Sequence, residues 1–324
     1  MSKERVDSSG DEAKVSCILR ESLAEFLGTA ILMIFGMGSV AQFVLSQGNT
    51  GSTDQVRWAW GFGVMFGVYV SGGLSGGHLN PAVTLTLCLF GRVPWNKLLP
   101  YCLGQYLGSF TASCLVFGVY YDAFNTFKNG SRTIETAGIF ATYPQDYLSV
   151  GNGLGDQIFG TAVLMLLVLA LTDPGNMAPS KGYVPVLVGL IVVAIGMTYS
   201  QNCGYAINPA RDLAPRLFTM AAGWGAQVFS HNNYKWFWIP IVGPHVGAIL
   251  GGGIYELCIN NTVPCFGRGN SIKLKICHSK KATIELPQEP VTPLAVISQT
   301  ESNAKVEDPG ANAHKEWKTS SVTT

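Results

Sequence analysis

Long stretches without a charged side chain alternate with short polar segments between positions 22 and 260. Six windows contain no Asp, Glu, Lys or Arg and run for 28, 34, 24, 16, 29 and 20 residues: 26–53, 58–91, 98–121, 157–172, 182–210 and 236–255. A helix needs about 20 residues to cross a bilayer. The windows therefore predict six spanning helices, the fourth completed by flanking residues such as Leu154 and Gly155.

The second and fifth windows are too long for one helix each, and both contain the tripeptide Asn-Pro-Ala near one end, at 80–82 and 208–210. Asn is a strong N-cap and Pro fits the first helical position, so each tripeptide predicts the start of a helix. Residues 80–90 would extend roughly 16 Å, half of a hydrocarbon core. The irregular backbone before such a half-helix, here 72–79, survives at membrane depth only inside protein or beside a wet cavity.

The two halves of the chain repeat each other. Gly-Thr-Ala at 28–30 recurs at 160–162, the Asn-Pro-Ala copies are offset by 128, and the Gly-rich stretch 104–108 recurs at 243–247. Each half carries three spans, an odd number, so the copies must be inverted in the membrane. Inverted repeats with broken helices place the working site at the midplane, where the copies meet.

Composition supports a membrane protein. Charged residues make up 13% of the chain, against roughly 25% in soluble domains, and positions 22–260 hold only 18 charges in 239 residues. The net charge of +1 comes with no basic stripe, so nucleic acid is not expected as a partner. The eight cysteines have no metal-finger spacing, and no nucleophile–base pair or phosphate loop stands out. We therefore expect no enzyme, no metal and no cofactor.

Lys and Arg near the spans predict the orientation. An inside N-terminus places most of them on the inner side, so both termini are expected in the cytoplasm, with membrane lipid around the bundle. The chain then divides into a cytoplasmic tail, 1–20, a membrane-spanning domain, 21–260, and a disordered cytoplasmic tail, 261–324. The domain comprises repeats 21–121 and 155–260, joined by an outer loop, 122–154. The sequon at Asn129 lies in that loop and is a glycosylation candidate, whereas the sequon at Asn260 lies inside and should stay bare.

These motifs resemble the aquaporin (major intrinsic protein) family over roughly residues 20–260. The Asp that follows Asn-Pro-Ala-Arg at 208–211 is similar to the aquaglyceroporin branch, and the stretches 138–144, 217–219 and 222–225 resemble animal aquaglyceroporins. The resemblance implies an all-α membrane protein with six transmembrane helices and two re-entrant half-helices. It also implies a homotetramer in the cell membrane that passively conducts glycerol, water and small uncharged solutes such as urea, and excludes ions and protons.

Two opposed half-helix N-termini would each present about half a positive charge at the midplane. Asn80 and Asn208 would point amide N–H groups into the lumen, which interrupts a proton wire and repels cations. Both motifs, Asn80-Pro81-Ala82 and Asn208-Pro209-Ala210, are therefore candidate pore elements. The resemblance implies a track of carbonyl acceptors before each Asn, formed by Gly76, Gly77, His78, Leu79, Gly204, Tyr205, Ala206 and Ile207.

Arg211 is a functional candidate because an Arg within a membrane window is costly. By resemblance, Trp60, Gly196 and Tyr205 complete a selectivity filter with it, in which Gly196 leaves room for a carbon backbone. Arg216 fits a surface or headgroup position better. Asp212 is expected to brace the half-helix rather than touch solute.

Three further polar residues are singled out. Glu25 and Gln157 are expected as buried braces for the pore-loop carbonyls, and Gln157 departs from relatives that keep a second Glu. His78 could sense pH, although packing against the loop is the simpler interpretation. Cys203 could expose a mercury-reactive thiol at the mouth.

Two alternatives remain open from the sequence. A water-selective aquaporin would need a narrow, His-lined filter, which Gly196 disfavours. A secondary transporter would need a membrane-embedded carboxylate for ion coupling, and only Glu25 could serve. Saturation with counterflow would favour the transporter.

Overall fold

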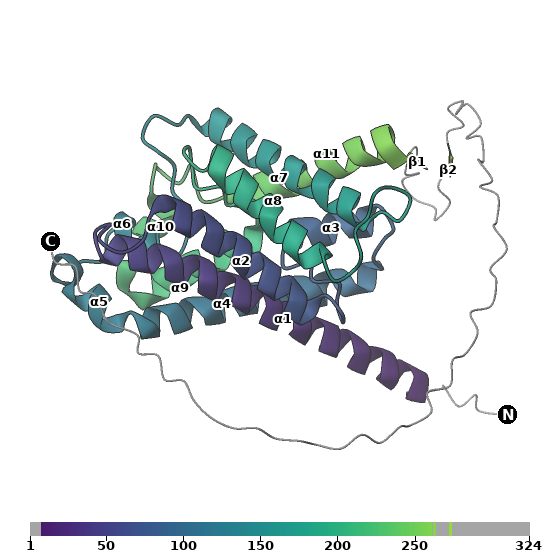
Figure 1. Ribbon diagram of the computed structural model, residues 1–324. Helices are drawn as coiled ribbons and strands as arrows, with labels where there is room; N and C mark the ends of the chain where they lie inside the picture. Colours follow the sequence, from purple (N-terminus) through teal and green to yellow (C-terminus); the bar gives the residue numbers. More distant parts are fainter. Residues whose placement is uncertain (1–7, 261, 264–271, 274–324) are drawn as a thin grey trace, which may run out of the picture. The chain divides into compact units, whose positions relative to one another are not determined.

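The computed structural model describes residues 8–260, 262–263 and 272–273 (Figure 1). The remaining positions, which include most of the predicted C-terminal tail, lie outside the described residues. Six long helices correspond to the six predicted spans: α1 (Ser8–Leu45), α2 (Thr53–Ser71), α4 (Leu98–Val119), α7 (Val150–Thr172), α8 (Val184–Tyr199) and α11 (Ile239–Tyr255).

Two shorter helices begin at the Asn-Pro-Ala motifs, α3 (Pro81–Leu89) and α9 (Pro209–Thr219). The connections carry the helical segments η1 (Trp95–Lys97), α5 (Tyr121–Thr126), η2 (Phe127–Gly130), α6 (Ile134–Ala137), η3 (Met220–Trp224), α10 (Gln227–Ser230) and η4 (Glu256–Asn260). Two short strands, β1 (Thr262–Val263) and β2 (Ile272–Lys273), pair antiparallel.

Among the residues that the structure describes, four helical segments are long and apolar enough to cross a membrane, at Ser16–Leu45, Trp95–Val119, Val150–Thr172 and Ile239–Asn260. The apolar helix α8 is shorter, with 16 residues, and α2 has 19, so each still extends roughly 24–28 Å at 1.5 Å per residue. Helix α1 begins at Ser8, so it continues well into the segment that the sequence assigned to the N-terminal tail.

The helices pack as two equivalent sets. Helix α1 contacts α2 and α4, α7 contacts α8 and α11, and α2 and α8 join the sets. Both half-helices pack against α4 and α11, so each of them contacts the repeat to which it does not belong as well as its own. This arrangement brings the two Asn-Pro-Ala motifs together.

Glycines at matching positions let the helices approach closely. A Cβ added to Gly108 would lie 2.2 Å from the carbonyl oxygen of Phe26, and one added to Gly247 would lie 2.2 Å from that of Ile158. Phe26 and Ile158 are themselves equivalent, 132 residues apart. The hydrophobic effect does not drive helices together in lipid, so close van der Waals packing at small residues stabilises the helix crossings instead. The recurring Gly pattern therefore marks the α1–α4 and α7–α11 crossings.

Candidate functional site

The two half-helices begin with the same cap. Asn80 and Asn208 have φ, ψ of −152°, 118° and −152°, 113°. The side-chain oxygen of Asn80 accepts from the backbone N–H of Ala82 at 2.9 Å, and that of Asn208 accepts from Ala210 at 3.0 Å. Each Asn thus satisfies a free N–H of its helix, and its side-chain NH2 group remains to donate elsewhere.

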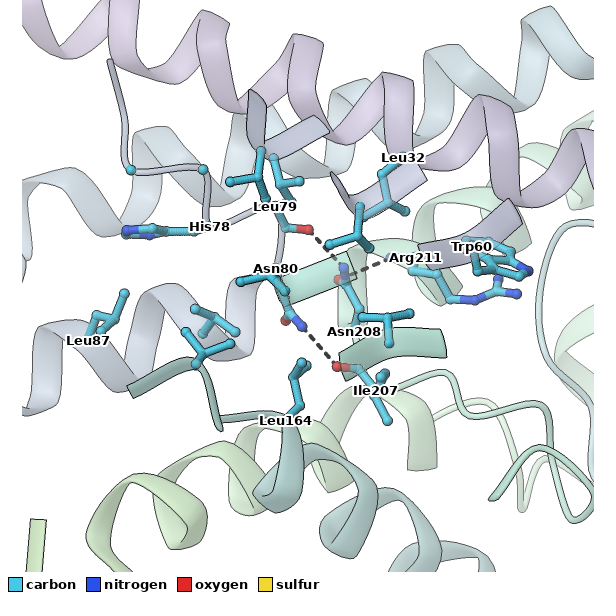
Figure 2. Close-up of a pocket in the computed structure, with 18 of the residues that line it drawn as sticks. Leu32, Trp60, His78, Leu79, Asn80, Leu87, Leu164, Ile207, Asn208 and Arg211 are labelled. Atoms are coloured by element: carbon cyan, nitrogen blue, oxygen red, sulfur yellow. Dashed lines mark hydrogen bonds between the residues drawn. The ribbon is translucent and has the colours of Figure 1, made fainter. Parts of the chain in front are cut away.

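That NH2 group crosses to the opposite repeat. Nδ2 of Asn80 donates to the carbonyl oxygen of Ile207 at 2.9 Å, and Nδ2 of Asn208 donates to that of Leu79 at 2.8 Å (Figure 2). Each NH2 has two hydrogens, so one serves this reciprocal pair and the other remains. The carbonyls of Leu79 and Ile207, both predicted members of the acceptor track, therefore already use one lone pair.

The backbone before each Asn takes left-handed conformations. Leu79, Tyr205 and Ile207 have φ of 53°, 40° and 41°, values that cost free energy in residues with a Cβ. Glycines supply further positive φ angles at 76, 77 and 204. Such backbone cannot form regular helix hydrogen bonds, so side chains must hold it.

In the first loop, residues 72–79, the holding group is the carboxylate of Glu25 on α1. It accepts from Ser75 Oγ at 2.5 Å, from the backbone N–H groups of His78 at 2.9 Å and Leu79 at 2.7 Å, and from Gln105 Nε2 at 2.8 Å. Its side chain is fully buried. Two of these donors are backbone N–H groups of the loop, so Glu25 orients the loop carbonyls only indirectly. A carboxylate cannot form hydrogen bonds with the carbonyl oxygens themselves.

In the second loop, residues 200–207, the equivalent group is the Gln157 amide on α7. Its oxygen accepts from the backbone N–H of Ile207 at 2.9 Å, and its nitrogen donates to Cys203 Sγ at 3.2 Å. Cys203 is 2% exposed, and its thiol donates to Asp156 at 3.2 Å. Cys203 therefore lies in the packing of this loop, and it is also among the residues that line a cavity beside the loop. Reaction of its thiol with mercury stays a prediction.

A cavity of about 310 Å³ runs beside both Asn residues. All eight residues of the predicted carbonyl track line it. Apolar side chains also line it, including Leu32, Val64, Val68, Val83, Leu164, Val168, Val188 and Val192. The cavity can therefore exchange hydrogen bonds with a solute and also contact its carbon atoms.

A second cavity of about 480 Å³ adjoins the first. The two share four lining residues, Trp60, Gly204, Tyr205 and Arg211. Figure 2 shows the Arg211 side chain beside the Trp60 ring. Its guanidinium carbon lies 4.1 Å from the centre of that ring, and Nη1 donates to the carbonyl oxygen of Phe140 at 2.8 Å. The structure thus brings three of the four predicted filter residues to the junction of two cavities.

Gly196 is placed differently from the expectation, because it is not among the lining residues of either cavity. A Cβ added there would lie 2.8 Å from Cζ of Tyr205. The space that this glycine leaves is occupied by the Tyr205 ring, so Gly196 influences the junction through the position of that ring.

The expectation for Arg216 is wrong. Its side chain is fully buried rather than at a surface. Nε and Nη2 donate to Asp212 Oδ1 at 3.0 and 2.8 Å, Nη2 also donates to the Thr142 carbonyl at 2.6 Å, and Nη1 donates to the Val228 carbonyl. Asp212 Oδ2 in turn accepts from the backbone N–H of Thr142. Asp212 therefore ties α9 to the segment 138–144, which carries the Phe140 carbonyl.

Several polar groups lie around these cavities. His78 lines the first cavity, with Nδ1 3.1 Å from Thr84 Oγ1 and its ring 5.2 Å from that of Tyr101. Tyr143 lines the second cavity, and its ring lies 5.3 Å from that of His231. Burial lowers the pKa of His231, an effect that Arg216 increases, so this imidazole is neutral at pH 7.

Sequence reasoning missed three anchoring groups, namely Phe140, Thr142 and Asp156. A signal existed only for Asp156, whose carboxylate stands next to Gln157 in the repeat.

Asn129 is exposed in η2. Within the described part of the chain, no three His, Cys, Asp or Glu side chains gather as metal ligands would.

A bundle of apolar helices around two half-helices and a lined cavity defines a multi-pass membrane channel. Residues 12–255 match the family model described as "Major intrinsic protein", and the chain belongs to this family of passive channels. It is 48% identical to Aquaporin-10 of Milnesium tardigradum over 89% of this chain and 74% of that protein. It is 47% identical to Aquaporin-9 of Homo sapiens, over 75% of this chain and 84% of that protein.

A solved structure gives the same result for the fold. The X-ray structure of the aquaglyceroporin from Plasmodium falciparum matches with a TM-score of 0.69 and 32% identity, covering 75% of this chain and 97% of that one. The predicted fold, six spans with two re-entrant half-helices, is confirmed. Family membership makes the protein a passive channel and not an enzyme.

Proposed function

We propose that this protein is a channel for glycerol and water, and that urea also passes. The observation that supports this most is the chemistry at the junction of the two cavities. Arg211 offers hydrogen bonds to hydroxyl groups there, and the rings of Trp60 and Tyr205 offer apolar surface to a carbon chain. A polyol can pass such a junction without leaving polar groups unpaired, which would cost a few kcal/mol each.

The half-helices support exclusion of ions and protons. Their positive N-terminal ends meet at Asn80 and Asn208, and a cation there faces the partial charges of both helices. A water molecule that accepts a hydrogen bond from the second N–H of each Asn interrupts the hydrogen-bonded chain of water along which a proton would be transferred. We assign the Asn-Pro-Ala motifs this role, with the carbonyl track as the acceptor path on either side.

The remaining assignments rest on the sequence and the family. We propose a homotetramer in the cell membrane with both termini in the cytoplasm and the segment 122–154 outside. In this orientation the second cavity is the outer mouth, and Asn129 is exposed to glycosylation. Glu25, Gln157 and Asp212 are proposed as braces of the pore loops, on the contacts described above.

Light scattering from proteoliposomes that contain the purified protein tests this function. Shrinkage in sucrose measures water flux, and re-swelling in glycerol or urea gradients measures solute flux. Rapid re-swelling in glycerol that does not saturate and shows no counterflow supports the proposal. Water flux without glycerol flux would assign a water-selective pore instead. Trp60→Ala is the matched variant, and it should widen the junction and weaken discrimination among polyols.

A further inference from the structure

The acidic residue near the second loop stands one position earlier than its counterpart in the first repeat. The first repeat has the pair Ala24-Glu25 where the second has Asp156-Gln157, because the two repeats are offset by 132 residues here. Glu25 accepts the hydrogen bonds of the first loop, whereas in the second repeat the carboxylate belongs to the preceding residue, Asp156. A neutral amide stands where the loop must be held.

A side-chain amide can hold the loop in only one of its two orientations. Its oxygen can accept from the backbone N–H of Ile207, but the flipped amide would present N–H groups to that N–H and repel it. Gln157 holds its oxygen 2.9 Å from Ile207 N. Some neighbouring group must attract the NH2 end to keep this orientation.

Asp156 supplies that attraction. Its Oδ1 atom accepts from Gln157 Nε2 at 3.3 Å and from the Cys203 thiol at 3.2 Å, and its Oδ2 atom accepts from Asn202 Nδ2 at 2.9 Å. An ionised carboxylate only accepts hydrogen bonds. Because the thiol hydrogen points to Asp156, the Cys203 sulfur is left as an acceptor for Gln157 Nε2, 3.2 Å away. Both partners of the NH2 end are therefore acceptors.

The consequence reaches the other repeat. Ile207, whose N–H is held by Gln157, uses its carbonyl to accept from Asn80 Nδ2 at 2.9 Å. A chain of hydrogen bonds thus connects Asp156 through Gln157 and Ile207 to the Asn at the start of α3. A flipped Gln157 would release Ile207 N–H and, with it, the left-handed turn that presents this carbonyl.

We propose that Asp156 is a positioning residue of the pore, which fixes the Gln157 amide and through it the second loop and Asn80. This role rests on the proposed channel function. It is separate from any contact with solute, because Asp156 lines neither of the two cavities.

Transplanting the pair of the first repeat tests the proposal. The full chain is reconstituted in proteoliposomes as wild type, Asp156→Ala, Gln157→Glu and the double variant, which copies Ala24-Glu25. Asp156→Ala should lower water and glycerol flux at least about threefold, because the carboxylate that orients the Gln157 amide is lost. Gln157→Glu alone places two carboxylates side by side and should also lower the water flux and the glycerol flux. The double variant should return to within about twofold of wild type, since a carboxylate accepts in either orientation.

Asn202→Ala is the matched control, because it removes another donor to Asp156 without changing Gln157. It should stay within about twofold of wild type. Wild-type flux in Asp156→Ala, or a double variant no better than Asp156→Ala, would overturn the proposal. If Asp156→Ala is not recovered as a monodisperse protein, the double variant must be, and its loss also overturns the proposal. A wild type without glycerol flux would refute the channel function instead.

Discussion

The first loop is held by one buried charge, and the second is held by several groups. Glu25 accepts four hydrogen bonds, two of them from the backbone of the first loop. In the second repeat, Gln157 accepts from one backbone N–H, and a separate ion pair, Asp212 with Arg216, fixes the far side of α9. Both loops nevertheless present an Asn with almost the same φ and ψ.

The difference follows from what each half-helix carries besides its Asn. The second repeat alone carries Arg211, whose guanidinium must be held against Trp60 and the Phe140 carbonyl. Asp212 and Arg216 hold the segment that contains Phe140. The cap is therefore symmetric where both repeats contribute the same Asn. The anchors differ because the second repeat also supplies Tyr205 and Arg211 to the junction of the cavities, where the first repeat supplies Trp60.

The largest expected effect comes from Asp212→Ala, which leaves the buried Arg216 without its carboxylate. Removing one partner of a buried ion pair costs about 3–5 kcal/mol. We expect a large drop in the thermal unfolding midpoint in detergent, together with loss of glycerol selectivity. The double variant Asp212→Ala/Arg216→Met removes both charges and should be more stable than Asp212→Ala. If the single variant unfolds like wild type, the ion pair does not hold the second repeat.

Glu25→Gln tests the charged anchor of the first repeat. The amide places N–H groups where the carboxylate accepted from donors, and each buried donor left unpaired costs about 1–3 kcal/mol. Unfolding midpoint and water flux should both fall. Gln157→Ala is the comparison, and it should cost less because Gln157 anchors one backbone N–H. An equal or larger loss in Gln157→Ala would reverse the ranking of the two anchors.

Gly196→Ala probes the junction of the two cavities, to which the second repeat contributes Tyr205 and Arg211. The new methyl group would lie 2.8 Å from the Tyr205 ring, so the ring must shift towards the lumen. Glycerol flux should fall several-fold, whereas water, which needs less width, should lose less; both are measured by light scattering. Gly196→Ala/Tyr205→Ala removes the ring and should restore glycerol flux. Unchanged glycerol flux in Gly196→Ala would show that the ring position does not set the width.

The smallest effect on transport is expected from Asn129→Gln, in the exposed connection between the repeats. The variant should lose the glycosidase-sensitive mass shift in an animal-cell membrane preparation and keep its water and glycerol flux. A mass shift that persists in Asn129→Gln would contradict the proposed orientation of the repeats.

The amino-acid sequence was enough to predict the elements that depend on local chemistry. Charge-free windows indicated the six spans, since a charge in hydrocarbon is costly wherever it lies. Asn followed by Pro predicted the starts of α3 and α9, because a cap and a fixed φ act on the next few residues only. The inverted repeat then predicted that these starts meet, and hydrogen bonds between Asn80 and Ile207 and between Asn208 and Leu79 join them.

The surroundings of individual side chains depend on how the helices and loops pack. Arg216 was expected at the surface, yet it is buried because Val228 and Thr142, the latter 74 residues away in the sequence, supply carbonyl acceptors beside Asp212. Gly196 was expected to open the lumen, yet the Tyr205 ring fills the space above it. Burial and hydrogen-bond partners depend on which segments pack together, and one position's residue type does not contain that information. Local patterns therefore determined the helices, and contacts between distant segments determined what surrounds each site residue.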